Sequence, residues 1–139
     1  IDEISQSDLK KLLATLKTCK NLAALRFDNS KLNSENLSKL CTLSKLSTLE
    51  LRNCGIDDRG LAALAKLNHL KRLHLGKAAL TAASVNTIKK MTDLRYLALD
   101  LRNNPQLAAF LEREMTSRGG RFENTGESVP DYTDFLDAP

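Results

Sequence analysis

A spacing of 24 residues between equivalent leucines is the feature of this sequence that most restricts its fold. Lines of this length begin at Leu22, Leu46, Leu70 and Leu94. Three further columns repeat with the same spacing, and they hold Leu25, Leu49, Leu73 and Leu97; Phe27, Leu51, Leu75 and Leu99; and Leu32, Ile56 and Leu80. Such agreement indicates stacked copies of one unit, because a single copy leaves its apolar face uncovered and its neighbours must cover it.

The two halves of each line carry different periodicities. The first half reads LxxLxL, an alternation typical of a short strand with one buried face. The second half places apolar residues three apart, which marks one face of a helix. These triplets are Leu37, Leu40 and Leu43; Leu61, Leu64 and Leu67; Val85, Ile88 and Met91; and, before the first line, Leu13, Leu16 and Cys19. Each line is therefore predicted to run strand, turn, helix, turn.

Residues that cap helix amino termini stand just before the predicted helices. Asn, Asp and Thr side chains accept hydrogen bonds from the exposed backbone N–H groups of a first turn. Equivalent positions of successive lines hold Asn33, Asp57 and Thr81. Ser5 with Asp8 has the spacing of a capping box, and Asn104 followed by Pro105 fits an N-cap and a first helical position.

The second line carries the clearest family motif. Its residues Leu46, Leu49, Leu51, Cys54 and Ile56 match the LxxLxLxxN/CxL signature, so the chain resembles leucine-rich-repeat proteins over about residues 4–117. The segment GIDDRGLAALA is similar to the ribonuclease-inhibitor-like and GALA-type subclasses. The resemblance implies an α/β fold, a right-handed leucine-rich-repeat solenoid with a parallel sheet on the concave side, helices on the convex side and helical caps at both ends.

These features divide the chain into a repeat domain and a tail. Residues 1–121 are predicted to form the leucine-rich-repeat domain, and residues 122–139 an acidic flexible tail. Within the domain we expect a cap helix over 4–20, repeats that start at 22, 46 and 70, and a terminal cap line over 94–118.

One family position departs from its usual residue in three of the four lines. It is normally Asn or Cys, and its side chain bonds backbone groups in the turn after the strand. The four residues here are Ser30, Cys54, Ala78 and Arg102. Because alanine offers no hydrogen-bonding side chain, we expect a local irregularity or a bridging water near Ala78.

Charge is divided unevenly between the two parts. The whole chain has a formal net charge of +4. All of its 21 Lys and Arg lie within residues 1–121, whereas residues 122–139 hold five acids and no base. The basic body can therefore attract either an anionic partner or the acidic tail.

Residues between the inward leucines are expected on the concave face, because side chains alternate along a strand. Neighbouring lines place Arg26, Glu50 and His74 in one row and Asp28 beside Arg52, so these charges are expected to pair. The other cations of this face lie on the third and fourth lines.

Arginine and tyrosine are enriched at binding hot spots. We therefore predict partner contacts at Arg52, Lys71, Arg72, His74, Lys77, Arg95 and Tyr96. The alternative is a solvated charged face that has no partner.

The carboxyl-terminal segment has a recognition pattern of its own. Within DYTDFLDAP, Tyr132, Phe135 and Leu136 form a candidate docking motif among acidic residues. Three interpretations stay open. The segment folds back over the basic face, it is a separate recognition peptide, or it is simply disordered.

Reactive chemistry is scarce in the sequence. It contains two histidines, and His69 reads as a residue near the end of a helix. No HExxH, GxSxG, GxxxxGK[ST] or GxGxxG motif occurs. The three cysteines, Cys19, Cys41 and Cys54, show neither a disulfide framework nor a CxxC pair. We therefore expect no catalytic residues, no cofactor and no metal.

Three functions remain compatible with these observations. The first is a non-catalytic module that binds a protein through the concave strand face and adjacent loops, as the target-recognition part of a larger protein or assembly. The second is binding of an anionic polymer or membrane by the basic body, although few aromatic residues are present to stack on nucleic-acid bases. The third is donation of an arginine, Arg52 or Arg72, to a partner GTPase.

Location is constrained only by what the sequence lacks. It contains no apolar run long enough to span a bilayer, and its first residues are polar and charged, unlike a secretory signal. Together with the cysteine pattern, these features favour an intracellular protein, either cytoplasmic or delivered into a host cell.

Overall fold

The structure, a computed structural model, describes residues 4–126, which form alternating helices and strands. Their order is α1 (Gln6–Leu16), β1 (Ala24–Asp28), α2 (Ser34–Leu40), β2 (Thr48–Arg52), α3 (Asp58–Leu64), β3 (Arg72–Lys77), α4 (Ala83–Lys90), β4 (Tyr96–Asp100), α5 (Pro105–Ser117) and β5 (Arg121–Asn124).

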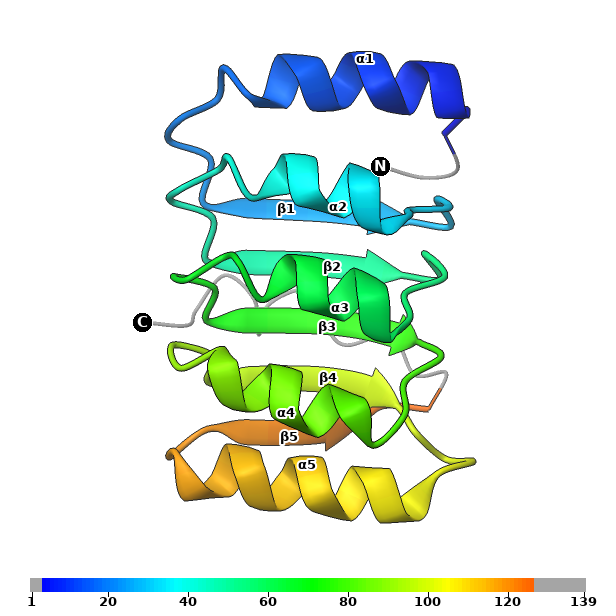
Figure 1. The fold of residues 1–139 in the computed structure, drawn as a ribbon, viewed down its shortest axis with the longest axis vertical. Coiled ribbons are helices and arrows are strands. Elements are labelled where there is room, and N and C mark those ends of the chain that lie inside the picture. Colours follow the sequence, from blue (N-terminus) through cyan, green and yellow to red (C-terminus); the bar gives the residue numbers. More distant parts are fainter. Residues whose placement is uncertain (1–3, 127–139) are drawn as a thin grey trace.

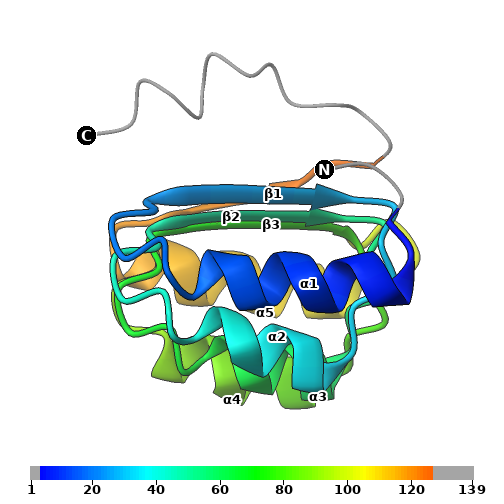
Figure 2. The ribbon, with the colours of Figure 1, turned by 90° about the horizontal axis from the view of Figure 1, so that it is seen from above.

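The strands form one parallel sheet in the order β1-β2-β3-β4-β5, and the helices form a second layer on one side of it (Figure 1). Seen from above, α1 and α5 lie closer to the sheet than α2, α3 and α4 do (Figure 2). Since α1 and α5 also stand at the two ends of the stack, each covers one end of the apolar interior. The α/β leucine-rich-repeat solenoid expected from the sequence is therefore confirmed.

The 24-residue spacing is the register of the sheet. Leu25 pairs with Leu49, and Leu49 pairs with Leu73. Side chains of the predicted leucine columns lie between the sheet and the helices, where Leu49, Leu51 and Leu73 are completely buried. Burial of a leucine side chain contributes roughly 1.5–3 kcal/mol, so the repeated columns account for the main favourable term in folding.

A fifth strand extends the sheet beyond the part of the chain predicted to be repetitive. The predicted boundary at residue 121 falls inside β5, which pairs with β4 through Tyr96↔Arg121 and Leu97↔Phe122. The chain reaches this position through Gly120. A Cβ there would lie 2.7 Å from the backbone oxygen of Arg95, so only glycine fits without displacing β4 or β5.

The expected irregularity in the third line lies earlier than Ala78. In the first two lines the turn after the strand uses Asn29 and Asn53, both with a φ of 53°. The equivalent residue of the third line is Lys77, which adopts this left-handed conformation less readily than asparagine. Gly76, one residue earlier, takes it instead with a φ of 58°, and the pairing of β3 with β4 shifts between His74 and Gly76.

Most of the predicted helix caps are formed. The side chains of Asn33, Asp57 and Asn104 each accept a hydrogen bond from the backbone N–H three residues later, at distances of 2.8, 2.8 and 3.1 Å. Thr81 differs, because its hydroxyl donates to Asp58 on α3 (2.5 Å) and accepts only a long bond from the N–H of Ala83 (3.3 Å).

The predicted Leu13–Leu16–Cys19 triplet is only partly in the core. Helix α1 ends at Leu16, so Cys19 lies in the turn that follows and is exposed. The buried residues of α1 are instead Leu9 and Leu13, four residues apart on one face.

Replacing Asp57 by alanine should lower the free energy of unfolding by about 1 kcal/mol, because the N–H of Gly60 loses its acceptor. Chemical denaturation measures the change. Asp57→Asn is the matched control, since asparagine caps helices about as well as aspartate. Equal destabilisation by both substitutions would show that the lost charge matters and the cap does not.

Candidate functional site

The open face of the sheet carries a connected group of five ionisable side chains at its centre. They come from three adjacent strands, β1, β2 and β3, and are Arg26, Asp28, Glu50, Arg52 and His74. Parallel pairing brings them together, because Arg26 is the register partner of Glu50, Glu50 of His74, and Asp28 of Arg52. We call this group the central charge network.

The acids of the central charge network are its hubs. Asp28 accepts hydrogen bonds from the Nε atoms of Arg26 (2.6 Å) and Arg52 (3.2 Å). Glu50 lies 3.2 Å from the Nε of Arg26, and its other oxygen lies 3.5 Å from Nδ1 of His74. The side chains of Asp28 and Glu50 are each 9% exposed and that of His74 is 2% exposed. These residues are therefore held in place by one another and are largely withdrawn from solvent.

A second group lies where strands β3, β4 and β5 begin. It consists of Lys71, Arg72, Arg95, Tyr96 and Arg121, and we call it the amino-end cluster. The register aligns Arg72 with Tyr96 and Tyr96 with Arg121, while Lys71 and Arg95 precede the strands. Backbone hydrogen bonds continue the ladder through these positions, from the N–H of Arg95 to the oxygen of Lys71 (2.8 Å) and from the N–H of Arg121 to the oxygen of Arg95 (2.7 Å).

Tyr96 is the organising side chain of the amino-end cluster. The guanidinium carbon of Arg72 lies 4.8 Å from the centre of the Tyr96 ring, a distance typical of a cation–π contact. The Tyr96 hydroxyl donates a 2.8 Å hydrogen bond to Glu123 of β5. Burial and this hydrogen bond both raise the pKa of Tyr96, so the phenol stays neutral and continues to donate. The Tyr96 ring therefore contacts the Arg72 guanidinium through its face and is held in position by the hydrogen bond of its hydroxyl to Glu123.

The seven residues predicted to contact a partner do not form one patch. Lys71, Arg72, Arg95 and Tyr96 lie together in the amino-end cluster. Arg52 and His74 belong instead to the central charge network, because Asp28 and Glu50 stand in the adjacent strands. The last of the seven, Lys77, lies at the opposite, carboxyl end of β3.

Two residues of the open sheet face were not predicted from the sequence. Arg121 and Glu123 join the face only because β5 pairs with β4. The signal available was the short alternation RFEN after two glycines, Gly119 and Gly120, which end the preceding helix. That alternation spans four residues, too few to stand out from a loop.

At the carboxyl end of β4, Asp100 forms a two-pronged ion pair with Arg102. The Nε and Nη2 atoms of Arg102 each lie 3.0 Å from one oxygen of Asp100. The hydrogen bond from Arg102 keeps the pKa of Asp100 below its usual value. The carboxylate is therefore fully ionised at neutral pH and holds the loop after β4.

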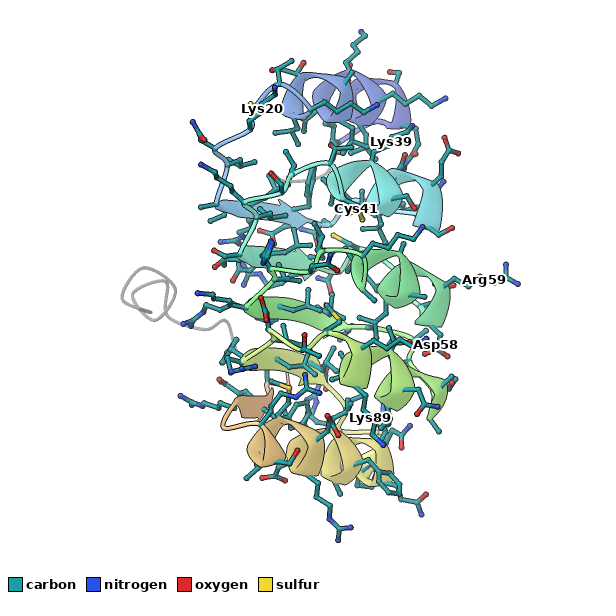
Figure 3. All side chains as sticks on the ribbon, turned by 60° about the vertical axis from the view of Figure 1, so that its left-hand side comes forward. Lys20, Lys39, Cys41, Asp58, Arg59 and Lys89 are labelled. Atoms are coloured by element: carbon teal, nitrogen blue, oxygen red, sulfur yellow. The ribbon has the colours of Figure 1, made fainter. Side chains whose placement is uncertain are left out.

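Further lysines surround the amino-end cluster on the loops that lead from each helix into the next strand. They include Lys20, Lys45 and Lys66, all exposed. Lys20 projects outward ahead of β1 (Figure 3). Within the described residues, Asp93 is the one acid on these loops, and it lies 3.4 Å from His69. The edge of the sheet at the strand amino ends is therefore predominantly basic.

Two of the three thiols among the described residues, those of Cys41 and Cys54, are packed into the structure. Cys54 is buried, its Sγ lies 3.4 Å from the backbone oxygen of Phe27, and burial raises its pKa to about 11. Burial also raises the pKa of Cys41, whose Sγ lies 3.2 Å from the oxygen of Ala63. Thiols that stay protonated at neutral pH are poor nucleophiles.

Two further observations concern the described part of the chain alone. Within residues 4–126, no group of three or more His, Cys, Asp or Glu could hold a metal ion. None of the helices in this range has the length and apolar character needed to cross a membrane. The predicted motif Tyr132, Phe135 and Leu136 lies outside the described residues.

Comparison with known proteins identifies the repeat and the fold. The family described as Leucine Rich repeat matches residues 42–65, the stretch that contains β2 and α3. No curated protein matches the sequence. Among solved structures, the tropomodulin C-terminal domain of Caenorhabditis elegans is similar, with a TM-score of 0.61 and 18% sequence identity over 93% of this chain and 87% of that one. The chain thus contains a leucine-rich-repeat motif in residues 42–65 and has the α/β solenoid fold of such repeats.

Proposed function

We propose that this leucine-rich-repeat solenoid is a non-catalytic module that binds a protein partner through the amino-end cluster and the adjoining face of the sheet. Leucine-rich-repeat domains generally mediate protein–protein interaction, and repeat solenoids use the extended face that their stacking creates. The observation that carries the proposal is the arrangement of Arg72 on the ring of Tyr96, at the strand ends where Lys71, Arg95 and Arg121 also lie.

The chemistry of the cluster favours a partner with acidic side chains. Lys71, Arg95 and Arg121 are exposed, and Arg72 and Tyr96 are half-buried, so their charges and ring surface can meet a partner. Arginine and tyrosine lose little conformational entropy on binding when they are already held in place, as the Glu123 hydrogen bond holds Tyr96.

The size of the face limits how a partner can bind. Five strands about 4.8 Å apart and about five residues tall present on the order of 400 Å². A stable interface covers roughly 800 Å² on each side. The partner must therefore also contact the loops that carry Lys20, Lys45 and Lys66, or a further part of the assembly to which this module belongs.

Reversing two charges of the amino-end cluster tests the proposal. Arg72→Glu/Arg95→Glu should abolish recovery of the partner in affinity capture with the full chain, followed by quantitative mass spectrometry. The control is Arg59→Glu/Lys89→Glu, which makes the same change of charge on exposed residues of α3 and α4, in the helical layer (Figure 3). We expect the control to recover the same proteins as the wild type. If both double variants recover equal amounts, the cluster does not bind the partner.

Binding of an anionic membrane or polymer is a second candidate, and the lysines along the same edge favour it. Such binding depends on total charge, so Arg72→Glu/Arg95→Glu and Arg59→Glu/Lys89→Glu should weaken it equally. It should also fall steeply as salt is raised. Sedimentation with vesicles that contain phosphatidylserine, at several salt concentrations, measures both effects.

Donation of an arginine to a GTPase has weaker support. Arg52 is engaged by Asp28, and Arg72 lies on Tyr96, so each would have to leave a formed contact. An assay of GTP hydrolysis with candidate GTPases tests it.

Finer classification and location also remain proposals. The GIDDRGLAALA segment supports the ribonuclease-inhibitor-like or GALA-type subclass. The free thiols Cys19, Cys41 and Cys54 support a reducing, intracellular setting, cytoplasmic or reached by delivery into a host cell.

A further inference from the structure

An acidic residue, Glu123, lies against the amino-end cluster. It stands on β5 two residues after Arg121, so both side chains point to the same face of the sheet. Its Oε2 atom accepts the 2.8 Å hydrogen bond from the Tyr96 hydroxyl and lies 3.6 Å from Nη2 of Arg121. The Glu123 side chain is nevertheless 34% exposed, so a hydrogen-bond donor from a partner can also reach its carboxylate.

The binding surface therefore has a positive part and a negative part. Lys71 and Arg95 are exposed where β3 and β4 begin. Glu123 is the register partner of Ala98, which stands three residues beyond Arg95. Three extended residues span about 10 Å, so a ligand that covers both parts meets cations and an anion that are about 10 Å apart along the strands.

Two classes of ligand respond differently to this arrangement. A uniformly anionic polymer such as double-stranded DNA carries one negative charge for about every 1.7 Å of its length. Charges act on one another over about 8 Å at physiological ionic strength. A polymer bound at Lys71 and Arg95 therefore also brings negative charge within range of Glu123 and is repelled. A protein surface avoids this repulsion, because it can place an acid at the cations and a donor at Glu123.

We propose that Glu123 determines the specificity of the amino-end cluster and selects a protein surface of mixed charge. A carboxylate of the partner meets Lys71 and Arg95, and a lysine, arginine or amide side chain of the partner donates to Glu123. Uniformly anionic polymers are disfavoured at the same surface. This inference rests on the proposed function and deepens it, because it specifies the chemistry that the protein partner must present.

Heparin, a uniformly anionic polymer, tests the repulsive part of the proposal. Glu123→Gln removes the charge of the side chain and keeps an acceptor for the Tyr96 hydroxyl. The control Glu112→Gln makes the same change of charge at an exposed residue of α5. In titration calorimetry at low salt, Glu123→Gln should bind heparin about threefold more tightly than Glu112→Gln, because the anion is removed from the binding surface itself. Equal affinities, or no heparin binding by either variant, would overturn the proposal.

Glu123→Asp separates the charge of the side chain from its hydrogen bond. Aspartate keeps the carboxylate, but it is one methylene shorter and holds the Tyr96 hydroxyl less well. Its heparin affinity should therefore return to that of the wild type. If Glu123→Asp binds heparin as tightly as Glu123→Gln does, the position of Tyr96 controls binding and the proposal is wrong. Circular dichroism checks each variant, and loss of fold in Glu123→Gln would contradict the proposal by assigning the charge to the stability of β5.

Affinity capture of the protein partner tests the attractive part of the proposal. Glu123→Gln should lower recovery about fivefold relative to Glu112→Gln, because a hydrogen bond to a charged group is roughly twice as strong as one to a neutral group. A substitution that strengthens heparin binding and weakens partner binding cannot act through total charge alone. Unchanged or increased recovery of the partner by Glu123→Gln would refute the selection of mixed charge.

The same capture separates failure of this inference from failure of the proposed function. If Arg72→Glu/Arg95→Glu loses the partner while Glu123→Gln retains it, the inference alone fails. If Arg72→Glu/Arg95→Glu recovers as much partner as the wild type, the proposed function fails, whatever the heparin affinities are.

Discussion

Replacing Leu73 by alanine is expected to lower the free energy of unfolding by about 2–5 kcal/mol, as observed for leucines in closely packed interiors. Leu73 belongs to β3, the middle strand of the sheet, and is completely buried. Alanine loses the transfer free energy of the leucine side chain and leaves a cavity that strands on both sides prevent from collapsing. Urea denaturation followed by circular dichroism measures the change.

The same column supplies a matched control. Leu25 occupies the equivalent position in β1, the edge strand, and is half-buried. Leu25→Ala should therefore cost only about 1 kcal/mol, because less apolar area returns to water and solvent can fill the gap. If both substitutions lowered the free energy of unfolding by the same amount, burial at the centre of the sheet would contribute no more than burial at its edge. Domains of this kind have about 5–15 kcal/mol in total, so Leu73→Ala removes a large share.

Replacing Asp28 by alanine should have the second largest effect, about 2–3 kcal/mol. Loss of one partner from a buried ion pair costs about 3–5 kcal/mol, because the remaining charge stays buried without compensation. Arg26 and Arg52 retain 27% and 16% exposure of their side chains, so water recovers part of that cost. The expected loss is measured by the same urea titration.

Asp93→Ala is the control for this prediction. Asp93 also pairs with a neighbour 24 residues away, His69, but its side chain is 44% exposed and that of His69 is 71% exposed. Exposed pairs contribute little, typically less than 1 kcal/mol. If the substitutions at Asp28 and Asp93 destabilise equally, the central charge network does not behave as a buried unit.

Stability of the central charge network matters for the proposed binding surface. It joins β1, β2 and β3 across the open face, on the side opposite the leucine columns. Its side chains are committed to one another, so the face presents a preformed surface with little side-chain freedom left to lose. The amino-end cluster, by contrast, keeps its lysine and two of its arginines exposed at the ends of the strands.

Periodicity was sufficient to predict the fold and its register. The pairing of Leu25 with Leu49 and of Leu49 with Leu73 follows from a spacing in the sequence, since stacked copies align equivalent residues. The salt bridges of Arg26 with Glu50 and of Arg52 with Asp28 follow from the same rule, because each pair stands in matching places on adjacent lines.

Features that depend on a break in the repeat were not predictable in this way. The bulge at Gly76 arises because Lys77 replaces the asparagine of the first two lines, and its position depends on which neighbour can adopt the left-handed conformation. Cys19 leaves the core because α1 ends at Leu16. Both outcomes reflect local backbone geometry that the apolar columns do not record.

The spacing of the leucines is enough to predict the repeat, the strand and helix of each line, and the register partners within the repeats. The folded structure, in contrast, was needed to show that β5 joins the sheet and brings Arg121 and Glu123 beside Tyr96. It also places four of the predicted binding residues in the amino-end cluster and two in the central charge network, and it places Lys77 apart from both. Four residues are too few to form a strand through β propensity alone. They become a strand because the edge of β4 provides partners for their backbone hydrogen bonds.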